Sequence, residues 1–147
     1  MIDNNNDPVT IAVNDHQQVG TIRQVAKLFK QIGSEADTES EFQVTNVSLA
    51  MLGKAVFFAE QNILNPQPDI PLETPKCNQN ETFVQWVKDF YEDMSRDDWV
   101  DLYQASLYLK YKDLRDITRA QAYSQGLLDD DLREGLPPGD EFMAFMF

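Results

Sequence analysis

Residues Trp99 to Arg119 read W-V-D-L-Y-Q-A-S-L-Y-L-K-Y-K-D-L-R-D-I-T-R, and this stretch decides the fold. Coiled as a helix, its first half is apolar on nearly every side, and such a helix must be buried. The apolar residues of that half are Trp99, Val100, Leu102, Tyr103, Ala105, Leu107, Tyr108 and Leu109. The segment 110–113, K-Y-K-D, interrupts the run, and Leu114 and Ile117 then lie on the inner face of a second helix. The stretch therefore predicts two packed helices joined by a short break.

Other helices are predicted on both sides of this pair. Ser95 and Asp98 form a Ser-x-x-Asp capping signature before Trp99. Upstream, helical spacing predicts helices over Thr21–Ile32, ended by Gly33, over Val47–Gln61, capped by Asn46, and within F-V-Q-W-V-K-D-F-Y at 83–91. Downstream, D-D-D-L-R at 129–133 is typical of the acidic start of a short helix, which Pro137-Pro138-Gly139 ends.

Two short strands complete the expected elements. V-T-I-A-V at 9–13 alternates apolar and polar residues, and 42–44 predicts a second strand. Between the helices, Leu64–Thr82 carries four prolines and is expected to be a loop, as is the acidic run Ser34–Glu41. We therefore predict an α+β fold.

Composition restricts the classes of function. The chain has 147 residues, 42% of them hydrophobic, so one domain with a real core is expected. A net charge of −13 argues against nucleic acid and anionic membrane surfaces, since both attract Lys and Arg. The single cysteine, Cys77, permits neither an internal disulfide nor a thiolate zinc cluster, and fits a reducing compartment. The N-terminus does not resemble a signal peptide, and no apolar stretch has the length of a membrane span.

Catalysis has little support in the residues. His16 and Cys77 each occur once, without a motif that would pair a nucleophile with a base. No glycine-rich phosphate loop is present. Carboxylates are plentiful, so a two-carboxylate hydrolase is the competing enzymatic hypothesis, although spacing does not place such a pair. We expect a protein that is not an enzyme and has no cofactor or metal.

The central stretch resembles the helix pair of the Skp family, the adaptors of Skp–cullin–F-box ubiquitin ligases. The family pattern is Leu-x-x-Ala-x-x-Tyr-Leu-x-Ile-x-x-Leu-x-Asp-Val-Thr. Without a gap, it is matched here by Leu102, Ala105, Tyr108, Leu109, Tyr111 in place of Ile, Leu114, Asp116, Ile117 in place of Val, and Thr118. The other segments follow in the family's order: the strand, the helix, the acidic loop, Thr45-Asn46-Val47, the Pro-rich insertion, Trp86 to Phe90, and D-D-L-R at 130–133.

The resemblance implies a BTB/POZ-like core over residues 1–125, a small sheet flanked by helices, and a C-terminal helical F-box-binding extension over 126–147. The protein would be a non-catalytic adaptor in the cytoplasm and nucleus that joins F-box proteins to a cullin N-terminal domain. Leu107 and Tyr108 match the cullin contact. The positions that match the F-box contact are Leu114, Ile117, Ala122, Leu132, Leu136 and Phe142.

The bland interpretation of these positions is core packing. For Leu114 and Ile117, core packing and an interface role are about equally well supported. Leu132, Leu136 and Phe142 lie in a short acidic segment, where apolar residues more often mark a partner site.

Several departures from the family pattern suggest an alternative to the adaptor function. Leu107 replaces the family's Asn, the family's Thr-Pro before the late acidic helix is missing, and its long last helix is absent. The chain has instead an apolar tail, a possible self-association site made of Met143, Phe145, Met146 and Phe147 after Phe142. The alternative function is therefore a Skp-like paralogue that has lost cullin binding and self-assembles, through this tail, as a structural protein.

Overall fold

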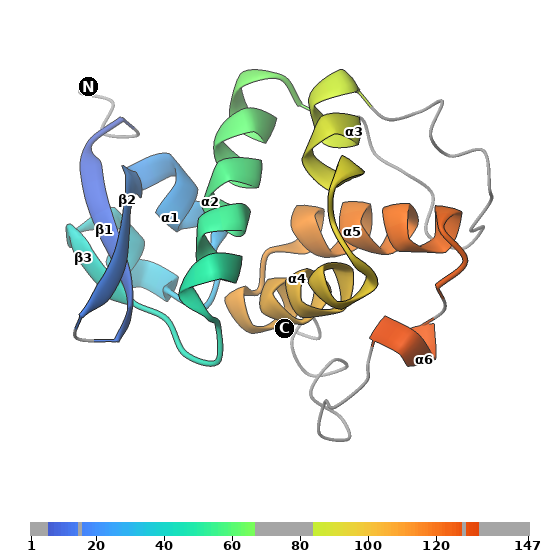
Figure 1. Cartoon of the computed structure of the whole chain (residues 1–147). Helices are drawn as coiled ribbons and strands as arrows, with labels where there is room; N and C mark the ends of the chain where they lie inside the picture. Colours follow the sequence, from blue (N-terminus) through green and yellow to red (C-terminus); the bar gives the residue numbers. More distant parts are fainter. Residues whose placement is uncertain (1–5, 15, 67–83, 128, 133–147) are drawn as a thin grey trace.

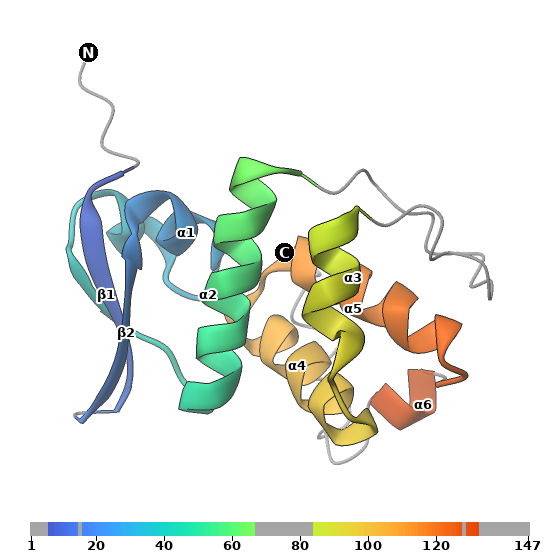
Figure 2. The ribbon, with the colours of Figure 1, turned by 45° about the horizontal axis from the view of Figure 1, so that its top comes forward.

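The protein has an α+β fold in which a small mixed sheet lies at one end and helices fill the rest (Figure 1). The computed structural model describes residues 6–14, 16–66, 84–127 and 129–132. Helix α2 stands between the sheet and a pair of helices, α4 and α5, and α6 lies at the end of that pair remote from the sheet (Figures 1 and 2). No helix in the described part of the chain is both long and apolar enough to cross a membrane.

The sheet has three strands in the order β2-β1-β3. They are β1 (Pro8–Asn14), β2 (Gln17–Ile22) and β3 (Glu41–Gln43). β1 pairs antiparallel with β2, which places Ile11 opposite Val19, and parallel with β3, which places Ile11 opposite Phe42. Since alternate side chains point to opposite faces, Ile11, Phe42 and Val9 lie on one face, where all three are buried.

The predictions of β1 and β3 are confirmed within one residue at each end, but β2 was missed. Thr21 and Ile22, predicted to open a helix, pair instead with Val9 and Pro8. Val19 and Thr21 share the core side of the strand, an alternation that the overlapping helical spacing concealed. These residues form a strand and not a helix because pairing with β1 satisfies their backbone groups. Helix α1 therefore begins only at Arg23.

Helix α1 (Arg23–Leu28) is half as long as the predicted helix Thr21–Ile32. It ends early because the chain is drawn to the end of α4: the Gln31 backbone N–H donates to the carbonyl of Leu109 at 3.0 Å, and its side chain donates to the carbonyl of Tyr108. Gly33, predicted as the cap, has φ of 73° and opens the 3-10 turn η1 (Gly33–Asp37). A left-handed backbone at that point favours glycine.

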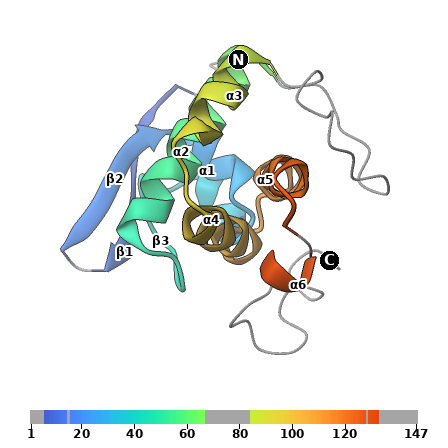
Figure 3. The same ribbon diagram turned by 45° about the vertical axis from the view of Figure 1, so that its right-hand side comes forward.

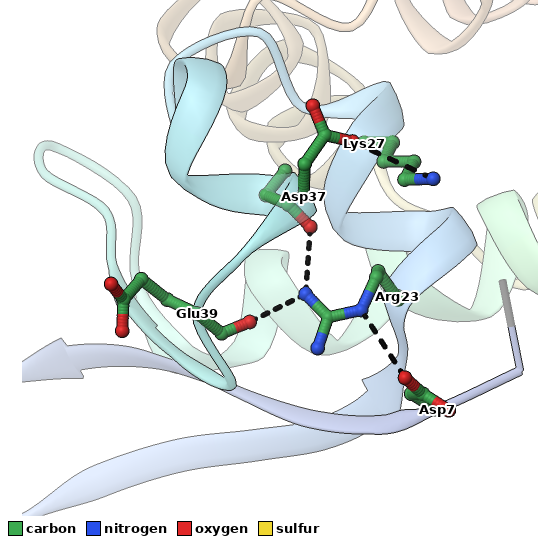
Figure 4. Close-up of polar contacts among 6 residues, drawn as sticks. Asp7, Arg23, Lys27, Asp37 and Glu39 are labelled. Carbon is green, nitrogen blue, oxygen red and sulfur yellow. Dashed lines mark hydrogen bonds and ion pairs between the residues drawn. The ribbon is translucent and has the colours of Figure 1, made fainter. Parts of the chain in front are cut away.

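Arg23 ties the sheet to the turn that leads into β3 (Figure 4). One guanidinium nitrogen donates to the carbonyls of Ala36, at 2.9 Å, and Glu39, at 2.5 Å. Nε of Arg23 lies 3.7 Å from the carboxylate of Asp7. The Arg23 side chain is 8% exposed, so these contacts compensate for burying its charge.

Replacing Arg23 with alanine should lower the free energy of unfolding by about 2–3 kcal/mol, because the buried carbonyl of Ala36 loses a charged donor. Lys27 is the matched control. Its ion pair with Asp37, at 3.5 Å, is exposed, so Lys27→Ala should cost under about 1 kcal/mol. Urea unfolding of both variants measures the difference. Equal losses would mean that Arg23 acts only as another surface charge.

Helix α2 (Leu49–Leu64) begins three residues after the predicted cap. Ser48 is the N-cap residue, and its hydroxyl accepts the Met51 N–H at 3.2 Å. Asn46 has φ of 64° and belongs to the turn before the helix, so its predicted capping role is wrong. Asparagine is one of the few residues that adopt this conformation readily, which explains its presence.

The predicted helix pair is confirmed. α4 spans Arg96–Leu109 and α5 spans Lys112–Ser124. The Ser95–Asp98 capping box is present, with both reciprocal hydrogen bonds at 3.1–3.2 Å. Lys110 ends α4 in the left-handed conformation, φ 58°, and that single residue turns the chain into the second helix.

The two remaining described helices are α3 (Gln85–Glu92), which overlaps the predicted segment 83–91 and ends one residue beyond it, and α6 (Asp129–Leu132), at the predicted acidic start. Most of the predicted Pro-rich loop lies outside the described residues.

Two separate apolar clusters form the interior. The main core joins the sheet, α1, α2, α3 and the inner faces of the pair. Around Phe58 it is aromatic: the Trp86, Phe90 and Tyr111 rings lie 5.2–6.0 Å from its ring. The second cluster lies between α4, the end of α5 and α6, and consists of Val100, Tyr103, Leu107, Ala122, Leu127 and Leu132.

Candidate protein-binding site

The second cluster is built on one face of α4. Val100, Tyr103 and Leu107 recur at helical spacing and are all buried. Their neighbours come from three further segments: Ala122 from α5, Leu127 from the turn after it, and Leu132 from α6. A helix that buries one face in the main core and the opposite face here explains why its sequence is apolar nearly all round.

Helix α6 closes this cluster through three contacts with α4. Leu132 is fully buried, its carbonyl accepts a hydrogen bond from the Gln104 side chain at 3.1 Å, and Arg96 pairs with Asp131 at 3.0 Å. A four-residue helix is not stable alone, so these contacts maintain it.

Burial of Leu132 contributes most of the free energy that holds α6 against α4. The Arg96 and Asp131 side chains are 48% and 36% exposed, and an ion pair in such a position contributes roughly 0–1 kcal/mol. Full burial of a leucine contributes about 1.5–3 kcal/mol. The apolar surface of α4 under α6 is therefore closed by a cover that depends mainly on one side chain.

Leu107 and Tyr108, predicted together as a cullin contact, lie in different surroundings. Leu107 is 2% exposed and belongs to the second cluster, so a direct contact with a partner requires α6 to move away. Tyr108 is partly exposed and packs against the main core. The structure thus brings Leu107 together with Ala122 and Leu132, two of the residues predicted to contact an F-box.

Leu114 and Ile117 are buried in the main core beside Tyr111. In this position they support the pair from beneath and do not themselves form its outer surface. Next to them, the Tyr91 and Thr118 hydroxyls are hydrogen-bonded at 2.6 Å. Burial raises the pKa of Tyr91, and this hydrogen bond partly opposes the shift. Burial likewise raises the pKa of Tyr111.

Leu136, Phe142 and the apolar tail Met143, Phe145, Met146 and Phe147 lie outside the described residues. Their predicted roles stay predictions.

Acidic groups surround the start of α4. Asp97 and Asp98 lie in its first turn, where they complement the helix dipole. Partial burial, followed by repulsion from these two carboxylates, raises the pKa of Asp101. A partner that approaches this side of the pair meets negative charge.

Part of this site was not predicted from the sequence. Val100 and Tyr103 were recognised as apolar but not as a second face, and Leu127, Gln104 and Arg96 were not singled out. The signal was present in the spacing of Val100, Tyr103 and Leu107, but all sides of α4 are apolar, so periodicity alone does not separate two faces.

A hollow of about 570 Å³ opens elsewhere, between α3 and the ends of the pair. Its lining is mostly polar and includes Gln85, Lys88, Asp89, Glu92, Gln121 and Gln125. Among the described residues, none that is predicted to contact a partner lines it. Within the described ranges, no group of three or more His, Cys, Asp or Glu side chains is placed to hold a metal ion.

No family model matches the chain, and no curated protein matches it.

Proposed function

We propose that the protein is a Skp-like adaptor with a BTB/POZ-like core that joins F-box receptors to a cullin in a ubiquitin ligase of the cytoplasm and nucleus. The observation that carries this proposal is the second cluster, an apolar face of α4 closed by a short, lightly held helix. A partner's amphipathic helix docks beside this face with anchors at helical spacing and contacts α6, which stays in place as one wall of the proposed site.

The order of the elements supports the same proposal. β1, α1, β3, α2 and the α4–α5 pair follow along the chain in the order that the resemblance to the Skp family implies. The match of Leu102 to Thr118 falls on the pair itself, with its break at Lys110.

The burial of Leu107 favours a second candidate, in which F-box binding is kept and cullin binding is lost. The family has an amide at this position, and here an apolar side chain is turned into the second cluster. A cullin group that pairs with that amide would find no partner, which costs about 1–3 kcal/mol when the group is buried.

Co-elution from a size-exclusion column with light-scattering detection tests both candidates. The purified chain is mixed with an F-box helix pair and, separately, with a cullin N-terminal domain. Complexes with both support the adaptor, and a complex with the F-box alone supports the second candidate. If neither partner co-elutes, the ligase proposal is wrong.

Tyr108→Ala should weaken cullin binding by about 30-fold, the effect of losing an aromatic anchor worth about 2 kcal/mol. The F-box helix pair should bind as before, because Tyr108 lies outside the second cluster. Leu107 is left unchanged, because truncating a buried leucine costs about 2–5 kcal/mol of stability and would confuse the result.

Tyr123, another partly exposed tyrosine, supplies the control for this experiment. It lies on α5 against Arg119, so Tyr123→Ala makes the same truncation at a different place on the helix pair. Isothermal titration calorimetry with the cullin domain measures both variants. If Tyr108→Ala binds the cullin like the unchanged protein, Tyr108 is not a contact.

A further inference from the structure

The C-terminal end of α4 has four backbone carbonyls, in residues 106–109, that no N–H inside the helix can satisfy. The turn that ends the helix satisfies two of them. The Lys110 N–H donates to the Leu107 carbonyl at 3.2 Å, and the Tyr111 N–H donates to the Ser106 carbonyl at 3.0 Å. The two remaining carbonyls, at the very end of the helix, accept hydrogen bonds from a distant part of the chain.

Gln31 supplies both of these donors, although it lies 77 residues from Tyr108 along the chain. Its backbone N–H donates to the Leu109 carbonyl at 3.0 Å, and its side-chain amide donates to the Tyr108 carbonyl. The oxygen of the same amide accepts the Thr45 backbone N–H at 2.7 Å. Gln31 follows α1, and Figure 3, which looks almost along α4 and α5, shows α1 behind this pair. The amide is thus fixed between the end of α4 and the segment before α2.

This bridge uses the chemistry of a glutamine side chain. Donating to one carbonyl while accepting from one N–H needs a group that carries both an NH₂ and a carbonyl oxygen. A glutamate at position 31 would accept from Thr45 but would not donate to Tyr108. A methionine, which is of similar length, offers no donor and only a weak acceptor.

We propose that Gln31 is a positioning residue for the cullin contact at Tyr108, an inference that rests on the proposed adaptor function. Tyr108 lies in the last turn of α4, and a helix end whose carbonyls lose their partners frays. A frayed turn leaves the tyrosine in several positions, and ordering it again on binding costs free energy. With the turn fixed by Gln31, the partly exposed Tyr108 is held against the main core before a partner arrives. Gln31 therefore acts through the tyrosine and needs no cullin contact of its own.

A double-mutant cycle with the cullin N-terminal domain, measured by isothermal titration calorimetry, tests this role. Gln31→Met should weaken cullin binding by roughly 3- to 10-fold, the effect of one side chain that must be ordered on binding. In the Tyr108→Ala chain the same substitution should have no further effect, because the residue through which Gln31 acts is gone. The matched control is Gln85→Met. The Gln85 side chain also donates a hydrogen bond, to Asp89 at 2.9 Å, but it lies on α3, and cullin binding should not change.

Two further measurements separate positioning from a general loss of folding. Amide hydrogen exchange of the free Gln31→Met chain should be faster at Lys110 and Tyr111, which close the turn, and unchanged at the capping box of α4. The F-box helix pair should bind Gln31→Met as it binds the unchanged chain, because Gln31 is not part of the second cluster.

Three results would overturn the positioning role while leaving the adaptor function in place. They are equal cullin binding by Gln31→Met and the unchanged chain, additive effects of Gln31→Met and Tyr108→Ala, and loss of F-box binding in Gln31→Met. Additive effects would mean that Gln31 does not act through Tyr108, and loss of F-box binding would reveal general unfolding. Failure of the unchanged chain to bind the cullin is a different result, because it would exclude the adaptor function and the positioning role together.

Discussion

Leu132→Glu should reduce binding of an F-box helix pair by at least about 30-fold. A carboxylate in place of Leu132 would stand unpaired against Val100, Tyr103 and Leu107, a position that is too costly for a charge. Helix α6 then leaves α4 to solvate the new carboxylate, and the partner loses one wall of its proposed site. Calorimetric titration with the F-box helix pair measures the change.

The control for this variant is Leu64→Glu. Leu64 ends α2 and is 78% exposed, so the same substitution there adds the same charge without disturbing a cluster. Binding should be unchanged. The main core contains no residue of α6, so both variants should keep most of their thermal stability. Full retention of binding by Leu132→Glu would remove α6 from the interface, and tighter binding would identify it as a cover that the partner displaces.

Phe58→Ala should lower the free energy of unfolding by about 3–5 kcal/mol. Phe58 has no exposed surface and its ring contacts those of Trp86, Phe90 and Tyr111, so truncation leaves a cavity where α2, α3 and the turn between α4 and α5 meet. The neighbours are large and buried or half-buried, and they cannot collapse into the space without losing their own packing. Urea unfolding, monitored by circular dichroism, gives the value.

Phe57 makes this a matched comparison. It is the preceding residue on the same helix, is 48% exposed, and stacks on Phe90 with ring centroids 5.8 Å apart. Phe57→Ala should cost about 0.5–1.5 kcal/mol, the contribution of such a pair. Similar losses at both positions would mean that the aromatic cluster is not the centre of the main core.

The helix pair shows what local sequence can predict. The Ser95–Asp98 box, the apolar run and the break before Lys112 each depend on residues close together in the chain, and each is present in the structure. β1 and β3 were predictable for the same reason, because alternation is a local pattern. The candidate site was predicted in part: Leu132 and Ala122 do lie together, but Leu107 joins them and not Tyr108.

The errors fall where distant segments compete for the same residues. Apolar residues do recur at helical spacing from Thr21 to Ile32. However, the first residues of this segment pair with β1, and the last turn is prevented by hydrogen bonds to the end of α4. Asn46 is a good cap residue by type, but the turn before α2 uses it for its backbone, and Ser48, two residues later, caps the helix. At the first helix, contacts elsewhere in the fold outweigh a propensity of well under about 1 kcal/mol per residue, and at α2 a neighbouring residue supplies the cap.

The sequence by itself determined the α+β class, the central helix pair with its cap and its break, and a strongly acidic chain with a single cysteine, because these depend on composition and on neighbours along the chain. Only the tertiary structure decided that α4 buries two faces in separate clusters, that Leu107 and Tyr108 belong to different ones, and that β2 exists. The reason is physical: burial on opposite sides of one helix and pairing between strands depend on which segments meet in space, and periodicity along the chain does not contain that information.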